Sequence, residues 1–420
     1  MRRLRPARIR LASTFGAAAL CLLLLAACED PSGVGLTVLD PGENDPRARS
    51  LPAETAFAPL TDVTGAFLTA QGFSAFRTLA GRVDDPLFGT TSARAYLDLL
   101  PPQNLPEGFR DRPIEQAILR LNRTYVYGDT TMPTRLDLRQ ISEEWNAVGA
   151  EADTLFPVMD ELITSFDVAA GDSLVEVALP AAWIAANDTT LRSTSFSTLF
   201  HGFQLSPGEG ASAVYGFTGA STLELISAED TVRYGVSELF SGIEGPETAP
   251  TADDLLLLQD GTSRGLELLF DLDPLGQSAI NAVFLRVNAD TAAAATNLPA
   301  GFARPFARQL ALYGFVTDTT QTPAVDVIIT DSNGSPVPFA EATLNEETQT
   351  YTFASSRINE IFQDQVLSRA EVDGFLIGFS RATSSLDVAP LVQASAGCGT
   401  ESGMPCEGPR ATIFLIPADG

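Results

Sequence analysis

Apolar and polar residues alternate along many short segments of the chain. In the segment at 114–122, IEQAILRLN, Leu119 and Leu121 share one face, while Arg120 and Asn122 share the other. A period of two is typical of a β-strand with one buried face. Similar segments recur between turn-forming residues, and long helical patterns are few. We therefore expect a mainly β protein built from tandem antiparallel β-sandwich units, jelly-roll-like, with a few short helices.

The segment at 114–122 has a counterpart of the same length and pattern, INAVFLRVN at 280–288. Further pairs of similar segments follow one another in the same order along the two halves of the chain. They are 92–100 with 263–273, 134–141 with 308–316, 172–187 with 348–363, 201–207 with 373–379, and 221–227 with 411–417. One match is within the reach of chance, but an ordered series indicates a duplicated unit of about 165 residues.

The duplication predicts the organisation of the globular part. Because a single hydrophobic core seldom serves roughly 370 residues, two domains are expected. We predict sandwich units at 51–240 and 255–420, joined by a linker at 241–254 that is rich in Pro, Gly and acidic residues. In the alternative arrangement the two halves share one sheet, and the sequence does not separate the two arrangements.

The N-terminal segment has the pattern of a secretory signal. Residues 1–10 carry five arginines and no acid, and an apolar run extends to Ala27. The run Leu25-Ala26-Ala27-Cys28 resembles a bacterial lipobox, so we expect 1–27 to be a lipoprotein signal peptide and Cys28 to carry the lipid. An ordinary cleavable signal is the alternative. Residues 28–50 are rich in Pro, Gly and Asp and predict a flexible tether.

Charge and the residue after Cys28 bear on location and partners. The formal net charge is −27, and every basic residue apart from the single histidine is arginine. Such an acidic chain argues against nucleic acid and anionic lipid headgroups as partners, because both attract positive charge. Residue 29 is Glu rather than the aspartate associated with inner-membrane retention in some bacteria, so we expect lipid anchoring in the outer membrane, with the exposed leaflet left open.

Two cysteines remain in the globular part. Cys398 and Cys406 bracket the loop-like run GTESGMP. In an oxidising compartment such a pair is expected to form a disulfide across a turn. Metal binding is the alternative, but it requires further ligands that are not nearby in the sequence.

Several motifs resemble the DUF4270 family of bacterial lipoproteins. They are TLAGRVDDPLFGTTSARAYLDLL at 78–100, TYVYGDTTMPTRLDLRQI at 124–141 and the opening CEDPSGVGL at 28–36. The family is known chiefly from Bacteroidota-like bacteria and has no established activity, so the resemblance implies a lipoprotein outside the cytoplasm and supplies no catalytic residues. The chain departs from the family in its acidity, its lack of lysine and its Ala-rich tract at 289–305.

The residues offer little support for catalysis. His201 is the only histidine, which excludes a multi-histidine metal site and leaves a Ser-His-Asp triad dependent on this one residue. We interpret His201 as structural or surface-exposed. Asp84 and Asp85 are a candidate carboxylate pair, but VDDPLFG equally predicts a turn that Asp initiates and Pro86 constrains. We favour the turn.

Metal and cofactor sites are not predicted either. The run that begins at Asp331 has Ala342 where a calcium loop needs a bidentate Glu, so it is interpreted as a hairpin turn. Asp129 in YGDTT is a weaker candidate for a calcium ligand and also suits a turn. Asp-Thr and Asp-Ser triplets, such as that at Asp129, resemble O-glycosylation signals, although the same residues gather at turns.

Two functions remain as hypotheses. The first is a non-catalytic, lipid-anchored cell-envelope protein that binds a glycan or a protein partner or has a structural role. Tyr125, Tyr127, Trp145 and Trp183 are its candidate binding residues, with core packing as the alternative for each. The second is a carboxylate-based glycoside hydrolase acting on polysaccharide, which requires two acids roughly 5–10 Å apart in a cleft. We favour the first.

Overall fold

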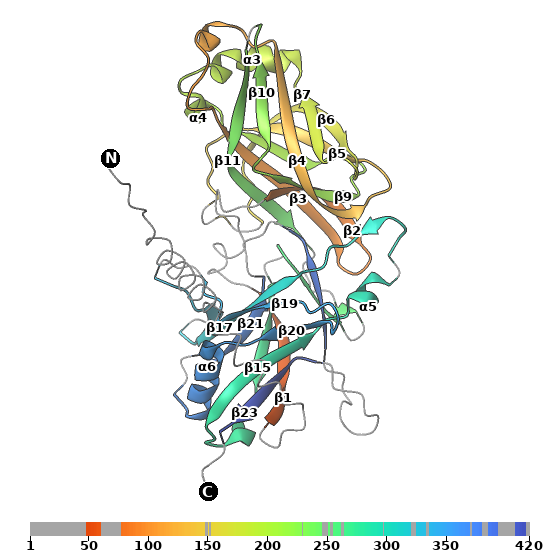
Figure 1. Cartoon of the computed structure of the whole chain (residues 1–420). Helices are drawn as coiled ribbons and strands as arrows, with labels where there is room; N and C mark the ends of the chain where they lie inside the picture. The colour runs from red at the N-terminus through yellow and green to blue at the C-terminus, as the bar shows by residue number, and fades with distance from the viewer. Residues whose placement is uncertain are drawn as a thin grey trace, which may run out of the picture. The chain divides into compact units, whose positions relative to one another are not determined.

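Most of the regular structure in the chain is β-strand (Figure 1). All pairings between the named strands for which a register is given are antiparallel, and the helices are short, so the predicted mainly β sandwich architecture is confirmed. The computed structural model describes residues 48–59, 77–147, 150, 153–228, 230–245, 251–252, 255–261, 264–296, 298–320, 325–332, 336–369, 372–379, 385–393 and 408–416.

The first sheet is 11-stranded and comes almost entirely from the N-terminal half of the chain. Across the sheet its strands are β11 (Thr231–Glu244), β10 (Thr222–Ile226), β4 (Gln116–Asp129), β9 (Ala213–Thr218), β2 (Arg77–Asp85), β3 (Gly89–Leu100), β8 (Phe203–Pro207), β5 (Thr134–Ile141) and β6 (Val158–Val168), with β7 (Leu174–Ala178) and β16 (Phe302–Ala303) paired to β4. β11 also pairs with β3, so the strands from β3 through β11, β10, β4, β9 and β2 form a closed circuit of neighbours.

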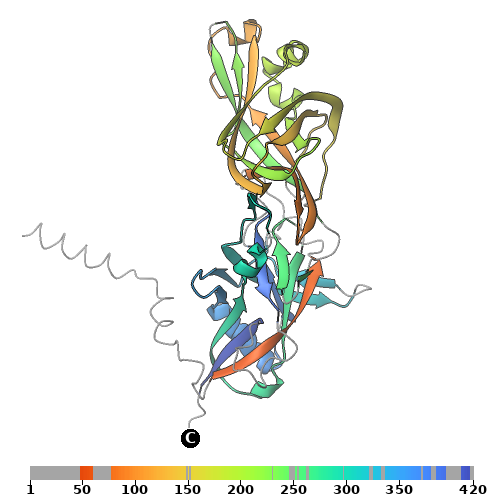
Figure 2. The same ribbon diagram turned by 90° about the vertical axis from the view of Figure 1, so that its right-hand side faces the viewer.

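The second sheet is nine-stranded and is built mainly from the C-terminal half. Across the sheet its strands are β18 (Val325–Ile328), β17 (Gln309–Asp318), β21 (Gly374–Gly378), β14 (Arg264–Phe270), β1 (Ala48–Pro59), β23 (Arg410–Leu415), β15 (Ile280–Asn288) and β20 (Thr350–Phe353), with β19 (Ala340–Thr343) paired to β17. β1 is the exception in origin, because it is the first described strand of the chain and yet lies between β14 and β23. The red end of the colour scale therefore lies among green and blue strands (Figure 2).

A small sheet and the helices complete the structure. The small sheet contains β12 (Thr251–Ala252), β13 (Leu255–Gln259) and β22 (Val388–Val392). The helices of the described residues are η2 (Phe109–Asp111), α3 (Ala181–Leu191), α4 (Phe196–Leu199), η3 (Asp273–Leu275), α5 (Thr291–Ala295) and α6 (Ser356–Val366). α6 begins at a favourable N-cap, because the Ser355 side chain accepts a hydrogen bond from the backbone N–H of Ile358 at 3.2 Å.

The order of strands agrees with the predicted duplication. The series β6, β5, β8, β3, β11, β10, β4 and β7 in the first sheet corresponds to β18, β17, β21, β14, β1, β23, β15 and β20 in the second. We call residues 77–244 the N-terminal repeat, and residues 255–416 together with β1 the C-terminal repeat. α3 follows β7 and α6 follows β20, so the helices also occupy equivalent positions.

The registers of the strand pairs agree with the alignment of the two halves. Three equivalent sets are Leu97–Phe203 with Leu268–Phe375, Leu138–Leu205 with Leu312–Ile377, and Leu119–Val177 with Leu285–Phe353. At β23 the pairing departs by two residues from the sequence match of 221–227 with 411–417. Leu119 pairs with Leu223, the third residue of the first segment, whereas Leu285 pairs with Ala411, the first residue of the second. A shift of two keeps the same residues facing the core.

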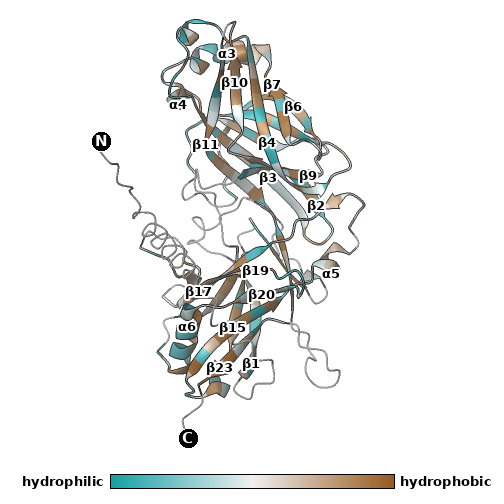
Figure 3. Cartoon of the chain, in the orientation of Figure 1, coloured by the Kyte–Doolittle hydropathy of each residue, from teal (hydrophilic) through white to brown (hydrophobic). Residues whose placement is uncertain are grey.

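Each repeat has its own hydrophobic core. The first core is built from alternate residues of β3, β4 and β5 and is closed by Ile184 and Leu191 of α3. The second core is built from β14, β15 and β17 and is closed by Ile358 and Phe362 of α6. Apolar residues are accordingly concentrated on the strands of both sheets (Figure 3). Fully burying one such side chain contributes about 1.5–3 kcal/mol, which makes these cores the main stabilising feature.

The repeats do not end at the boundaries that were predicted from the sequence. β11 continues to Glu244, β12 falls at 251–252, and β1 places residues 53–59 in the sheet of the C-terminal half. By its contacts the chain divides into Met1–Ala48, of which only Ala48 is described, and one compact unit from Arg49 to Gly420. Among the described helices, none has the length and apolar character needed to cross a membrane.

Candidate functional site

The four candidate aromatic residues occupy very different environments. Tyr125 and Tyr127 are 7% and 0% exposed and lie in a cluster with residues from both repeats, such as Leu386 and Phe302. The Tyr125 hydroxyl accepts a hydrogen bond from the Leu386 N–H at 3.0 Å. These two tyrosines therefore offer no surface to a ligand.

A bulge in β4 explains why the two tyrosines point away from the first core. Ahead of it, Leu119 and Leu121 face that core, but the pairing of β4 with β9 shifts between Arg123 and Tyr125. The extra residue reverses the alternation, so Val126 packs against the first core and Tyr125 packs on the opposite side. A bulge of this kind leaves no mark in the periodicity of the sequence.

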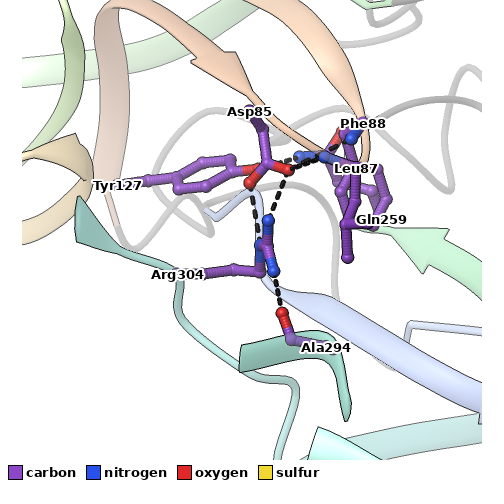
Figure 4. Close-up of polar contacts among 7 residues, drawn as sticks. All are labelled: Asp85, Leu87, Phe88, Tyr127, Gln259, Ala294 and Arg304. Atoms are coloured by element: carbon purple, nitrogen blue, oxygen red, sulfur yellow. Dashed lines mark hydrogen bonds and ion pairs between the residues drawn. The ribbon is translucent and has the colours of Figure 1, made fainter. Parts of the chain in front are cut away.

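Asp85 is the centre of a buried ion pair between the repeats (Figure 4). Arg304 donates from Nη2 to Asp85 Oδ1 at 2.6 Å and from Nε to Oδ2 at 2.8 Å, and both side chains are fully buried. The Tyr127 hydroxyl donates to Oδ2 at 2.7 Å, and the N–H groups of Leu87 and Phe88 donate to Oδ1. Burial alone would raise the pKa of Asp85, but the hydrogen bonds from Arg304, Tyr127 and Leu87 outweigh it and hold the pKa below its usual value.

The network around Asp85 connects segments of both repeats. Within the described chain, the hydrogen bonds that the Asp85 carboxylate accepts come from the fold itself, and Arg304 Nη1 in turn donates to the carbonyl oxygen of Ala294. The predicted turn at Asp85 is present, since its carboxylate accepts the N–H groups two and three residues later. Asp84 is exposed and pairs with Thr90 and Arg82, so the two neighbouring acids do not face a common space as a hydrolase pair would.

Trp145 is half-buried and is fixed by the N-terminal repeat. Its indole Nε1 donates to the carbonyl oxygen of His201 at 2.8 Å. Its ring packs against Tyr96 and Phe156, with centroid distances of 6.0 and 5.1 Å. His201 thus supports Trp145 through its backbone, and this contact assigns no chemistry to its imidazole.

A buried acid in the C-terminal repeat was not predicted from the sequence. Asp260 is 6% exposed, and its Oδ2 accepts a hydrogen bond from the Ser385 hydroxyl at 2.7 Å. Burial raises the pKa of Asp260 to about 8, and the nearby Asp387 adds to the effect. Asp260 followed by Gly261 has the pattern of an ordinary turn, so no sequence signal distinguishes it. Neither Asp260 nor Asp387 lines the cleft between α3 and β6.

Trp183 borders a cleft on the N-terminal repeat. The cleft has a volume of about 390 Å³ and lies between α3 and the edge strand β6. Its lining residues are Gln140, Met159, Asp160, Glu161, Leu162, Ile163, Pro180, Ala182, Trp183, Ala186 and Asn187. Trp183 is held in place because its Nε1 donates to Gln140 Oε1 at 3.1 Å and its ring packs on Phe203 at 5.6 Å.

The edge strand β6 gives the cleft its shape. β6 pairs with β5 on one side and ends the order of strands in the first sheet, so among the described strands none pairs with its other edge. The register of β6 against β5 shifts twice, on either side of Arg139 in β5. These shifts leave Met159, Asp160 and Glu161 outside regular pairing with β5. Met159 and Leu162 remain 45% and 42% exposed, which is unusual for two large apolar residues so close together.

The cleft combines apolar walls with an acidic rim. Trp183, Leu162 and Met159 supply apolar surface, and exposed Asp160 and Glu161 supply negative charge. Backbone N–H and C=O groups at a free strand edge can pair with another extended chain. The arrangement can therefore hold an extended ligand by backbone hydrogen bonds, apolar contacts and charge.

Of the remaining predicted sites, Asp129 lies with Asp84 and Phe302 on the wall of a cavity of about 240 Å³. Asp129 uses its carboxylate within its own turn, accepting from Thr131 N and Oγ1 at 2.8 and 2.6 Å. Within the described ranges, no group of three or more His, Cys, Asp or Glu side chains is arranged to hold a metal ion. Cys28, Cys398 and Cys406 lie outside the described residues, so their predicted lipidation and disulfide stay predictions.

Comparisons with protein-family models, with curated proteins and with solved structures find no match to the chain. The function is therefore inferred from the geometry of the cleft and from the sequence itself.

Proposed function

We propose that this protein is a lipid-anchored, non-catalytic protein of the cell envelope that binds an extended segment of a protein partner in the cleft between β6 and α3. The observation that carries the proposal is the free edge of β6, among the described strands, beside an apolar cleft. Strand addition at such an edge uses the backbone for affinity and the adjacent pockets for specificity.

A protein segment fits the cleft better than a glycan does. Sugar rings need an open aromatic face, but the ring of Trp183 packs on Phe203 and lies near Phe200, and its Nε1 is already bonded to Gln140. Tyr125 and Tyr127 are buried, which removes two further candidates for stacking. The exposed side chains of Met159 and Leu162 suit apolar residues of a partner strand.

The charge of the cleft indicates which partner segments bind best. Asp160 and Glu161 are exposed on the rim, and the whole chain has a formal net charge of −27. Complementary charge speeds association and selects between partners. We expect a segment in which apolar residues alternate with arginine or lysine.

The anchor belongs to the same proposal. The signal pattern before Cys28 and the resemblance to DUF4270 lipoproteins support attachment to the outer membrane. The tether predicted at 28–50 is shortened at its end, because β1 begins at Ala48. Incorporation of an alkyne-labelled fatty acid in a bacterial host tests the attachment. Cys28→Ser should abolish the label, whereas Cys21→Ser should keep it; label retained in Cys28→Ser would contradict the anchor.

The binding site is tested by photocrosslinking in the native cell. A photoreactive phenylalanine analogue replaces Leu162 in the cleft, or Val316, which is 39% exposed on β17, as the control. Position 162 should give adducts of discrete mass with proteins, and Met159→Arg should remove them, because it introduces like charge toward a basic partner. Equal adducts from both positions, or adducts unchanged by Met159→Arg, would contradict the site.

A second measurement separates the proposed function from its alternatives. Purified full-length protein is incubated with a panel of polysaccharides while binding and reducing-sugar release are both recorded. Binding that Trp183→Ala abolishes would assign the cleft to glycans instead of proteins. Release of reducing sugar would overturn the non-catalytic function and favour the glycoside hydrolase.

A further inference from the structure

β1 holds an internal position in a sheet whose neighbouring strands are distant from it in sequence. It lies between β14 and β23, and its pairs with β14 run from Ala53–Phe270 to Pro59–Arg264. On its other side the Ala53 N–H donates to the carbonyl oxygen of Pro409 at 2.9 Å. The sequence continues from β1 through residues 60–76 into β2, which belongs to the other sheet.

The equivalent strand of the N-terminal repeat is held much more firmly. β11 occupies the same position between β3 and β10, and it follows β10 directly through a turn in which Ser227 N–H donates to the carbonyl oxygen of Asp230 at 2.9 Å. β11 buries Tyr234 and Phe240 completely. It is thus fixed both by its connection and by its core side chains.

Within residues 48–56 of β1, the side chains contribute less apolar contact than those of β11 do. Among its residues from Ala48 to Ala56, Leu51 alone is buried, at 9% exposure. Pro52, Glu54 and Ala56 are exposed, and Pro52 has no N–H to give to the sheet. Backbone pairing with β14 extends over residues 53–59, and backbone pairing depends little on which chain supplies the strand.

We propose that β1 is an exchangeable strand, and that the groove between β14 and β23 accepts β1 from a second copy of this chain to give a strand-exchanged dimer. When β1 leaves, the edges of β14 and β23 lose their hydrogen-bond partner, and unpaired edges recruit another strand. The β1 of another copy is the strand whose fit to this groove the structure already displays. Exchange of an identical element adds no new interface chemistry, which makes it an accessible route to dimers.

The test uses the exposed pair Glu54 and Leu269, which face each other across β1 and β14. Two full-length chains, one carrying Glu54→Cys and the other Leu269→Cys, both with Cys28→Ser and with different tags, are co-expressed and oxidised. Mass spectrometry then identifies peptides joined through positions 54 and 269. A disulfide between the two chains can form there only when β1 of one copy lies in the groove of the other.

The duplication supplies a matched control. Glu238 and Asp98 face each other across β11 and β3, which is the equivalent pair in the N-terminal repeat. Chains carrying Glu238→Cys and Asp98→Cys are co-expressed in the same way. We expect at least about tenfold more interchain linkage for 54–269 than for 98–238, because a short turn joins β11 to its neighbour β10 within the same repeat.

A single chain carrying both Glu54→Cys and Leu269→Cys completes the experiment. It should form an intrachain disulfide and, once locked, should be monomeric when its mass in solution is measured by light scattering. An intrachain disulfide in this variant, together with interchain linkage no higher than in the 98–238 control, would overturn strand exchange. Failure of the double variant to form any disulfide would contradict the register of β1 and overturn the proposal as well.

Discussion

The two repeats share an order of strands and differ at the strands that close and border them. Equivalent strands in the centre of each sheet keep both their neighbours and their register, as with Leu97–Phe203 and Leu268–Phe375. In the N-terminal repeat, β11 lies between β3 and β10. The equivalent position in the C-terminal repeat, between β14 and β23, is taken by β1, which comes from a distant part of the sequence. Central strands are constrained by core packing on their side chains, whereas closing and edge strands are free to diverge.

The outer edge shows the same divergence. β6 has 11 residues and two register shifts, whereas the equivalent β18 has four residues and pairs with β17 without a shift. A long, irregular edge is a liability because it invites pairing with other chains. Its retention in one repeat only is consistent with a binding role for that repeat, which is where the proposed cleft lies.

The largest effect is expected from breaking the link between the repeats. Arg304→Ala leaves the fully buried Asp85 carboxylate without its cation, and loss of one partner of a buried pair costs about 3–5 kcal/mol of unfolding free energy. Urea denaturation measures the change. Arg308→Ala, which removes an exposed ion pair with Glu346, should change stability by less than about 1 kcal/mol. Similar effects from both variants would mean that the link between the repeats contributes little.

A smaller effect should separate Gly202 from its equivalent Gly374, each of which precedes a phenylalanine in the matched segments 201–207 and 373–379. Gly202 has a φ of +92°, and a Cβ there would overlap the carbonyl oxygen of Leu97, so Gly202→Ala should cost about 3 kcal/mol. A Cβ at Gly374 would meet side-chain atoms of Phe315 and Leu269 rather than backbone, so Gly374→Ala should cost less, about 1–2 kcal/mol. Thermal denaturation compares the two variants.

Gly210→Ala serves as the control for this comparison. Gly210 also has a positive φ, +74°, but a Cβ there would have open space around it. It should therefore report the conformational cost alone, about 1 kcal/mol. If Gly202→Ala were no worse than Gly210→Ala, the close approach to β3 would not be the reason for glycine in the N-terminal copy.

The last comparison concerns two buried aspartates whose pKa values are shifted in opposite directions. Arg304 and its neighbours hold the pKa of Asp85 below its unfolded value. The contribution of ionised Asp85 to the unfolding free energy is therefore present above the unfolded pKa and is lost as the pH falls through the folded pKa. Burial raises the pKa of Asp260 to about 8, so the folded state holds its proton where the unfolded state releases it. The contribution of protonated Asp260 to the unfolding free energy is complete below the unfolded pKa of about 4, and it is lost as the pH rises toward the folded pKa of about 8.

Asp260→Asn tests this behaviour. Between about pH 4 and pH 8 the raised pKa of Asp260 should lower the unfolding free energy by up to about 1.4 kcal/mol per pH unit. The variant should flatten that slope, as measured by urea denaturation at several pH values. Asp387→Asn provides a second variant in the same cluster, and an unchanged slope in both variants would show that neither carboxyl is protonated in the folded state.

Much of the fold was predictable because it depends on local periodicity. Alternation around Leu119 and its counterpart Leu285 predicts strands, and the ordered matches between the halves predict the repeat that the registers display. The predicted turn at Asp85 also followed from nearby residues alone. These features need only residues that are close in sequence.

The candidate site was predictable only in part. Trp183 was among the candidate residues, yet nothing in the sequence distinguishes it from Tyr125 and Tyr127, which a bulge in β4 turns toward the contact between the repeats. The partner of Asp85, Arg304, lies 219 residues away, and the acidity of Asp260 depends on burial by distant strands. Neither relation has a spacing that a sequence pattern can reveal.

Periodicity and composition, which act over a few residues, were enough to identify strands, the duplication and the signal pattern that ends at Cys28. Long-range packing selected which strands became neighbours, which edge stayed open and which side chains were buried. The clearest example is β1, where the sequence predicted neither the strand, whose first residues were assigned to the tether, nor the sheet that it joins, since the edges of β14 and β23 are far away in sequence. Such pairing is chosen by packing over the whole fold, and packing is not encoded in any single segment.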